Sequence, residues 1–293
     1  MEHYPVLLQE VIAFLRPRKG EDFIDATIGQ GGHSREILLA TAPTGRLLGI
    51  DWDKSSLKSA KKNLAEFSRR PVLAEGNFSD IDSIAQKQGF SRVSGILFDL
   101  GFATSQLKTL PGLSFMTDSQ LDMNVSGRPV MLYGRQYRRV EEIIKRMPEK
   151  DLANLLYQYG DIRRSWAVAK RIKRGAEHRP LTTTKELVQA IGVSDPRILA
   201  PIFQAFRIAI NDEFNNLIAG LSAAVNLLTP GGRLAVISFH SGEDRIVKNF
   251  FRQRQELKII TAKPVMATDE EVDKNPHSRS AKLRAAIKVK SKK

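Results

Sequence analysis

Short apolar runs alternate with amphipathic segments over the first hundred residues. Runs of strand length cover residues 22–26, 46–50, 72–74 and 93–100. Between them, residues 34–40 and 54–67 carry apolar positions at helical spacing. Strands that alternate with helices predict a parallel sheet with helices on both faces.

The alternation stops at about residue 106 and resumes after residue 205. The intervening stretch is charged and helical in pattern, and a long amphipathic helix is expected over 203–228, followed by a strand at 233–239. We therefore predict an α/β domain formed by residues 1–105 and 206–293, with an inserted helical subdomain at 106–205. The insertion is the expected substrate-recognition part.

Composition narrows the class of protein. The 293 residues include no cysteine, so disulfides, thiolate zinc sites and cysteine nucleophiles are excluded. No apolar run approaches the roughly 18 residues of a membrane span, and no basic segment precedes a hydrophobic one at the amino terminus. The net charge of +14 favours a polyanionic partner. We expect a cytoplasmic protein that binds nucleic acid and no membrane.

A glycine-rich turn, Gly29-Gln30-Gly31-Gly32, follows the first strand, which carries Asp25. The dinucleotide fingerprint requires a third glycine where Ser34 stands, and a P-loop requires a lysine that is absent. Asp51 ends the second strand and is suited to accept both hydroxyls of a ribose. This arrangement fits S-adenosylmethionine, which has a ribose but no pyrophosphate, and no metal is required.

Blocks along the whole chain resemble the bacterial MraW/RsmH family, the 16S ribosomal RNA cytosine-N4 methyltransferases. They are HYPVLLQEVI at 3–12, DATIGQGGHS at 25–34, GIDWD at 49–53, GILFDLGFATSQL at 95–107, GLSFMTDSQLDM at 112–123, FQAFRIAINDE at 203–213, TPGGRLAVISFHSGEDRIVK at 229–248 and NPHSRSAKLRA at 275–285. The resemblance implies a Rossmann-like class I S-adenosylmethionine methyltransferase sheet. It also implies N4-methylation of a cytidine in small-subunit ribosomal RNA.

The same resemblance implies which residues contact S-adenosylmethionine. They are Gly31, Gly32, His33, Asp51, Phe78, Asp99 and Gln106. Phe78 is suited to stack beside the adenine, although an aromatic residue there is by itself more typical of a core. Asp99 is suited to hold the methionine amino group or a polar group of the base. His33 taken alone is more typical of a helix cap than of a catalyst.

The catalytic candidates are carboxylates in the family blocks. An acceptor for the N–H groups of a cytosine amine would raise its electron density and take its proton. Asp99, Asp118 and Asp122 are the available candidates. The amino-methyltransferase tetrapeptide Asn/Asp/Ser-Pro-Pro-Tyr/Phe is absent after the fourth strand. His240 and Ser241, which follow a later strand, fit a substrate contact and a structural turn equally well.

Several stretches depart from the family pattern, and three of the departures are at single positions. Lys108 stands where the family has Asp after its Gln-Leu pair, Asn124 replaces an Arg, and Gly242 replaces a Leu. We expect substrate contacts in these stretches, so the departures bear more on the identity of the nucleotide than on the cofactor.

Two other classes of function stay open. One is a methyltransferase of the same fold that acts on another RNA, a protein or a small-molecule amine, and the other is a non-catalytic RNA-binding relative. Basic residues crowd the insertion, and they fit either phosphate binding or a solvated helix face: Arg163, Arg164, Lys170, Arg171, Lys173, Arg174 and Arg179. Free ribosomal RNA and an assembling 30S particle are both open as substrate. The oligomeric state is open too, with a homodimer among the alternatives.

Overall fold

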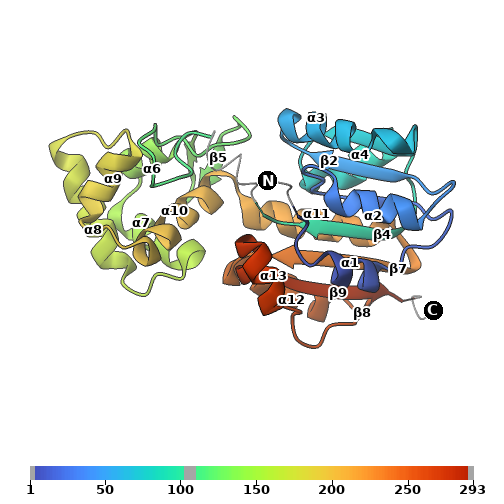
Figure 1. Ribbon diagram of the computed structural model, residues 1–293. Helices are drawn as coiled ribbons and strands as arrows, with labels where there is room; N and C mark the ends of the chain where they lie inside the picture. The colour runs from blue at the N-terminus through green and yellow to red at the C-terminus, as the bar shows by residue number, and fades with distance from the viewer. Residues whose placement is uncertain (1–3, 102–109, 290–293) are drawn as a thin grey trace. The chain divides into compact units, whose positions relative to one another are not determined.

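The structure is a computed structural model that describes residues 4–101 and 110–289 (Figure 1). The chain divides into two compact units, Met1–Gly101 with Asn215–Lys293, and Phe102–Phe214. The second unit is a continuous insertion into the first. It begins four residues before the expected insertion at 106–205 and ends nine residues after it. No helix within the described ranges is both long enough and apolar enough to cross a membrane.

A seven-stranded sheet forms the centre of the first unit, in the order β3-β2-β1-β4-β7-β9-β8. Its strands are β1 (Phe23–Asp25), β2 (Leu47–Asp51), β3 (Pro71–Glu75), β4 (Val93–Asp99), β7 (Leu228–Ser238), β8 (Leu257–Ile259) and β9 (Lys282–Lys288). The first five are parallel in the sheet, and β9 is antiparallel to both β7 and β8. The predicted α/β fold is confirmed. The strand order reverses between β1 and β4, where open α/β sheets bind their ligands.

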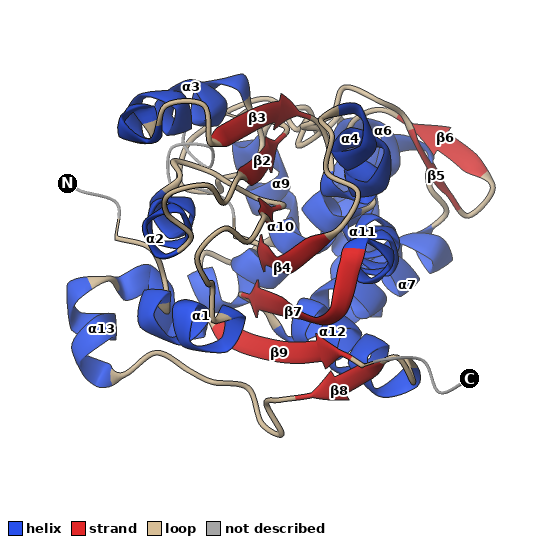
Figure 2. Ribbon diagram, turned by 90° about the vertical axis from the view of Figure 1, so that its right-hand side faces the viewer, coloured by secondary structure: helices blue, strands red, loops and turns tan. Residues whose placement is uncertain are grey.

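Helices cover both faces of this sheet (Figure 2). Side chains alternate between the faces along each strand, so that in β4 Ile96 and Phe98 join one core cluster and Leu97 joins the other. Short elements complete the unit: η1 (Ala65–Phe67), η2 (Phe78–Asp80), α13 (Asp269–Lys274) and η3 (Pro276–Ser280). One face carries α1 (Leu8–Leu15), α2 (Gly32–Ala40) and α3 (Lys54–Asn63), and the other carries α4 (Ile81–Lys87), α11 (Glu213–Leu227) and α12 (Ser241–Gln253).

The single helix expected over 203–228 is wrong. The chain forms α10 (Pro196–Ile210), breaks at Asn211 and Asp212, and continues as α11. Asp212 has φ 52°, which no helix interior allows. The Asn211 side chain donates to the carbonyl of Met123 at 2.8 Å and accepts from the Val125 N–H at 2.9 Å. These contacts are distant in sequence. The helical spacing of apolar residues continues across the break and therefore does not reveal it.

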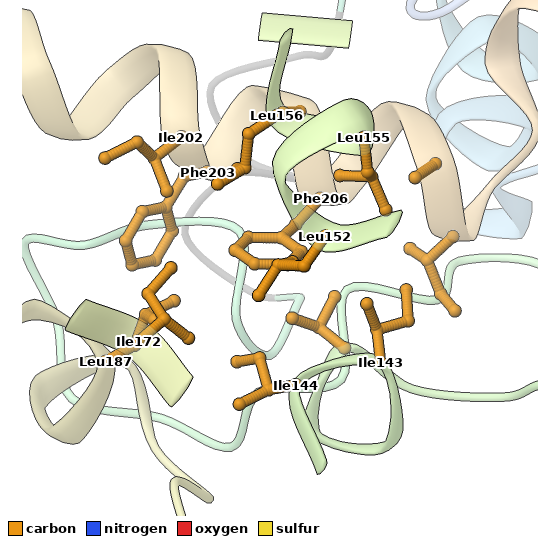
Figure 3. Packing of buried hydrophobic residues seen from close by; sticks show 14 of the residues in the cluster. Ile143, Ile144, Leu152, Leu155, Leu156, Ile172, Leu187, Ile202, Phe203 and Phe206 are labelled. Carbon is orange, nitrogen blue, oxygen red and sulfur yellow. The ribbon is translucent and has the colours of Figure 1, made fainter. Parts of the chain in front are cut away.

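The second unit has a hydrophobic core of its own (Figure 3). Phe206 of α10, Leu152 of α7 (Glu149–Gly160) and Ile143 of α6 (Val140–Arg146) are fully buried in it. The sequence predicts only helices here, but the unit also contains an antiparallel hairpin of β5 (Val130–Leu132) and β6 (Arg135–Tyr137). Its remaining helices are α6 (Val140–Arg146), α7 (Glu149–Gly160), α8 (Ser165–His178) and α9 (Thr184–Ile191).

Candidate active site

The glycine-rich turn joins β1 to α2 at the carboxyl edge of the sheet. Gly31 has φ 85° and is the N-cap of α2, a backbone conformation that favours glycine. A Cβ on Gly32 would lie 2.4 Å from the Pro5 Cγ atom. Gly32 is therefore required by packing against the amino-terminal segment, whether or not it also contacts a cofactor. The turn leaves the first N–H groups of α2 at the site of strand-order reversal.

Asp51 ends β2 and fastens this turn to the sheet. Its Oδ2 accepts from the Gly29 N–H at 3.0 Å and its Oδ1 accepts from the Asp53 N–H at 2.9 Å. Burial raises the pKa of Asp51 to about 6, and the backbone hydrogen bonds oppose part of that shift. Each carboxylate oxygen has a second lone pair, so the group can still accept from two ribose hydroxyls.

Asp99 ends β4 beside β1. Its backbone N–H donates to Thr27 Oγ1 at 2.6 Å, which ties the two strand ends together. Its Oδ1 is buried and has no hydrogen-bond partner among the residues that the structure describes. Burial raises the pKa of Asp99 to about 7, with a further contribution from the Glu243 carboxylate. A buried acceptor without a donor is costly, so the geometry suits a ligand that brings an N–H group.

His33 lies between Asp99 and the amino-terminal segment. Its Nε2 is 2.9 Å from the Val6 carbonyl oxygen and its Nδ1 is 3.7 Å from Asp99 Oδ2. Nε2 donates to the carbonyl, so in the neutral ring Nδ1 presents its lone pair to Asp99. Burial lowers the pKa of His33. The expected capping role is wrong, because Gly31 occupies the N-cap position of α2.

Asp25 and Thr27 complete the polar cluster at this strand end. Asp25 is 1% exposed and accepts from Ser34 Oγ at 2.7 Å. Burial raises its pKa to about 6, opposed by the hydrogen bond from Ser34. Sequence analysis assigned no role to Thr27. The signal available was its position two residues after Asp25, where the strand ends and a short polar side chain can reach β4.

Phe78 begins η2 and packs into the core on the face that carries α4 and α11. Its ring lies edge-on to Phe98, with ring centroids 5.7 Å apart and an interplanar angle of 75°. A Cβ on Gly220 of α11 would lie 2.9 Å from the Phe78 ring. Phe78 is therefore a packing residue of this core.

Asp118 and Asp122 belong to the second unit, and each has local partners. Asp118 is exposed and its Oδ1 accepts from the Lys185 N–H at 3.3 Å. Asp122 accepts from the Asn124 N–H at 3.3 Å and its Oδ2 lies 3.6 Å from Arg139 Nε. Both therefore belong to a different compact unit from Asp99.

Gln106 and Lys108 lie outside the described residues. Asn124, which stands where the family has an arginine, organises its own loop: its Nδ2 donates to the carbonyls of Arg128 and Arg138, each at 2.7 Å. Gly242 is buried in the first turn of α12. The structure thus gives Asn124 a role in holding the chain and gives no separate account of Gly242.

His240 caps α12. Its Nδ1 accepts from the Glu243 N–H at 3.4 Å, and Glu243 Oε2 accepts from the His240 N–H, also at 3.4 Å. This reciprocal arrangement is a capping box. It favours the structural interpretation of the turn at His240 and Ser241. It also holds the Glu243 charge close enough to raise the pKa of Asp99.

Comparison with known proteins gives relatives over nearly the whole chain. A protein of Thermomicrobium roseum is 41% identical, covering 98% of this chain and 94% of its own length. One of Persephonella marina is 40% identical, covering 99% of this chain and 100% of its own. Both are named ribosomal RNA small subunit methyltransferase H. A solved methyltransferase homolog of Pyrococcus horikoshii has a TM-score of 0.48 at 11% identity, covering 98% of this chain and 67% of that one, which is too low to add to the assignment.

The family comparison agrees with these relatives. The family described as the MraW methylase family matches residues 1–289. The match spans both units, including the polar strand ends of the first and the whole of the second. The chain therefore belongs to the MraW methylase family.

Proposed function

We propose that this protein transfers the methyl group of S-adenosylmethionine to the exocyclic N4 amine of a cytidine in small-subunit ribosomal RNA. The observation that carries the proposal is the buried Oδ1 of Asp99, which lacks a donor at the strand-order reversal of a methylase-family sheet. Relatives named for methylation of small-subunit ribosomal RNA support the substrate. The cytosine N4 position rests on the family resemblance.

The cofactor site consists of the strand ends of β1 and β2 and the turn between β1 and α2. Asp51 accepts from the ribose hydroxyls, and Gly31 and Gly32 let the backbone approach the ligand without side-chain interference. His33, Phe78 and Gln106 are assigned to the same site by the resemblance. The raised pKa of Asp51, about 6, still leaves it ionised at neutral pH, as a strong acceptor requires.

S-adenosylmethionine supplies a methyl group on a sulfonium. Transfer is an in-line displacement in which the N4–C bond forms, the C–S bond breaks, and the electron pair of that bond goes to sulfur. The amine loses one proton. Asp99 Oδ1 is the acceptor we assign, because its pKa of about 7 matches an acceptor that works near neutral pH. The Asp99 carboxyl is protonated once it has taken this proton. The Nδ1 lone pair of His33, 3.7 Å from Asp99 Oδ2, favours that protonated form.

Asp118 and Asp122 remain candidates for orienting the base. Asp122 already faces Arg139 at 3.6 Å, whereas the exposed carboxylate of Asp118 accepts only from the Lys185 N–H among the described residues. Asp118 is therefore the freer acceptor of the two. The insertion has a core of its own and is the part we assign to substrate recognition. We assign the protein to the cytoplasm because its proposed substrate is ribosomal RNA.

Nucleoside analysis of small-subunit ribosomal RNA tests this function in cells. Mass spectrometry of RNA from cells with and without the gene should show an N4-methylated cytidine that disappears on deletion and returns with the wild-type gene. A loss confined to another RNA, or to a methylated protein, favours the alternative methyltransferase. An unchanged set of methylated nucleosides and proteins favours the non-catalytic relative.

A further inference from the structure

The positive charge of the second unit is concentrated in one short segment. Phe102–Phe214 contains 18 Lys and Arg residues against 12 Asp and Glu residues. Residues 163–179 hold seven of those basic residues and only one of the acidic ones, so the rest of the unit holds eleven of each. The whole excess charge of the unit therefore lies on α8 and the residues that flank it.

Part of this charge is used inside the fold. Arg171 Nη1 donates at 3.2 Å to the carbonyl of the last residue of α9, and Lys173 Nζ donates at 2.7 Å to a carbonyl near the end of α6. Arg179 Nη2 donates to Gln189 Oε1 at 2.9 Å. All three side chains hold neighbouring helices in place, and Arg171 and Lys173 do so as cations at helix carboxyl ends.

The other four basic side chains have no such task. All four are exposed, and none makes a hydrogen bond or an ion pair with any residue in 4–101 or 110–289: Arg163, Arg164, Lys170 and Arg174. They are therefore available to an anionic partner.

Trp166 lies among these cations with 55% of its surface exposed. It precedes Lys170 by four residues and Arg174 by eight, so the three side chains share one face of α8 over about 12 Å of helix axis. The opposite face is buried through Val168 and Ile172. The indole makes no ring contact with any described residue.

We propose that this face of α8 binds an unpaired segment of RNA, with Trp166 stacked on a base and Lys170 and Arg174 on the adjacent phosphates. The inference rests on the proposed function, which supplies the RNA. A flat aromatic ring between cations recognises single strands, because only an unstacked base offers its face to an indole. Glu177 is the single acidic residue of the segment and lies in the last turn, so a basic protein partner is disfavoured.

Tryptophan fluorescence tests the stacking directly. The chain has two tryptophans, so Trp52→Phe leaves Trp166 as the only reporter. Titration of that variant with a ten-nucleotide single-stranded RNA should quench its emission, and a blunt RNA duplex of equal length should quench it much less. Equal quenching by both, or none by either, overturns the proposal.

Binding measurements separate stacking from charge. Trp166→Ala should weaken affinity for the single strand at least about fivefold, the low end for one stacked base, without changing its dependence on salt. Trp166→Phe should restore part of the affinity. Lys170→Gln with Arg174→Gln should weaken affinity and reduce the logarithmic salt slope by about 0.7 for each phosphate that is no longer neutralised. Lys61→Gln with Lys87→Gln removes two exposed charges of the first unit and is the matched control.

Each outcome bears separately on the surface and on the reaction. If N4-methylcytidine forms and the α8 variants bind RNA like the control, the surface proposal is wrong and the function stands. If Trp166→Ala changes sedimentation of the protein but not its RNA affinity, the face is a protein interface and the proposal is wrong. If the variants lose RNA affinity while no RNA is methylated, the surface stands and the proposed function fails.

Discussion

Three aspartates end three neighbouring strands, and the burial of each lowers the stability of the folded protein. Asp25, Asp51 and Asp99 lie at the carboxyl ends of β1, β2 and β4, and burial raises the pKa of each. A carboxylate that folding makes harder to ionise lowers stability above its unfolded pKa. Buried carboxylates with raised pKa values are typical of functional sites. At the residue scale the site is therefore a cluster of buried carboxylates, and a bound ligand that donates hydrogen bonds to them should reduce the free-energy cost of burying them.

The substitution Asp51→Ala tests the cofactor site. It removes the acceptor for two ribose hydroxyls and should weaken S-adenosylmethionine binding by roughly 2 to 4 kcal/mol. Isothermal titration calorimetry measures the affinity, and Asp82→Ala, which removes an exposed acid on α4, is the control. Unchanged affinity in Asp51→Ala contradicts the assignment.

The substitution Asp99→Asn tests the cost of burying the Asp99 carboxylate. The pKa of Asp99 is about 7 in the folded protein, above the ordinary value of 3.8, so ionisation between about pH 4 and 7 lowers the stability of the wild type. The variant lacks this penalty and should be more stable than wild type at pH 8, by at most about 4 kcal/mol, and no more stable at pH 4. Urea unfolding of the ligand-free proteins at the two pH values measures the difference. A gain of equal size at both contradicts the assigned pKa.

At the scale of elements, the basic residues of α8 divide into those that hold helices and those that face solvent. Arg171 reaches the end of α9 at Ile191, whereas Lys170, one residue earlier, has no partner among the described residues. Sequence spacing places both on a charged helix and does not distinguish them. The distinction depends on where α9 lies, which only the tertiary structure supplies.

This division predicts different costs for two adjacent substitutions. Arg171→Ala removes a hydrogen bond to the α9 carboxyl end and should lower the free energy of unfolding by about 1 kcal/mol. Lys170→Ala should change it by less than about 0.5 kcal/mol. Urea denaturation followed by circular dichroism measures both, and equal losses would refute the division.

Sequence patterns predicted those elements whose periodicity is local. The first two strand–helix repeats, the glycine turn and the acid at the end of β2 are all read from neighbouring residues. The hairpin of β5 and β6 was missed because it lies within a helical pattern, although Tyr133 and Gly134, with φ 49° and 73°, form a turn that a Tyr-Gly pair between apolar residues could have signalled. The break before α11 and the His33–Asp99 pair depend on contacts distant in sequence.

At the scale of the whole molecule, the chain forms two units, one from a single continuous segment and the other from two separate segments. Phe102–Phe214 is continuous and buries its own core, whereas the first unit needs both Met1–Gly101 and Asn215–Lys293. In the sheet, β7 from the later segment pairs along β4 from the earlier one, and α11 and α12 cover one face. The first segment alone would expose the part of that face that α11 and α12 cover.

Separate expression of the segments tests this organisation. Residues 102–214 should fold alone and unfold cooperatively on heating, because their core is complete within the segment. Residues 1–101 should not, since β4 would lose its partner strand and its apolar face would be uncovered. Circular dichroism melting of the two fragments measures this. A cooperative transition in 1–101, or its absence in 102–214, contradicts the division.

The reaction in purified form tests the central claim most directly. Wild-type protein, small ribosomal subunits or their RNA, and labelled S-adenosylmethionine should give N4-methylcytidine on nucleoside analysis, at a rate that falls below about pH 7 as Asp99 becomes protonated. Asp99→Asn should be at least about 100-fold slower, the low end for loss of a general base. Its rate should not show the fall below about pH 7. Label recovered in uridine, adenosine or protein, with none in N4-methylcytidine, would contradict the account.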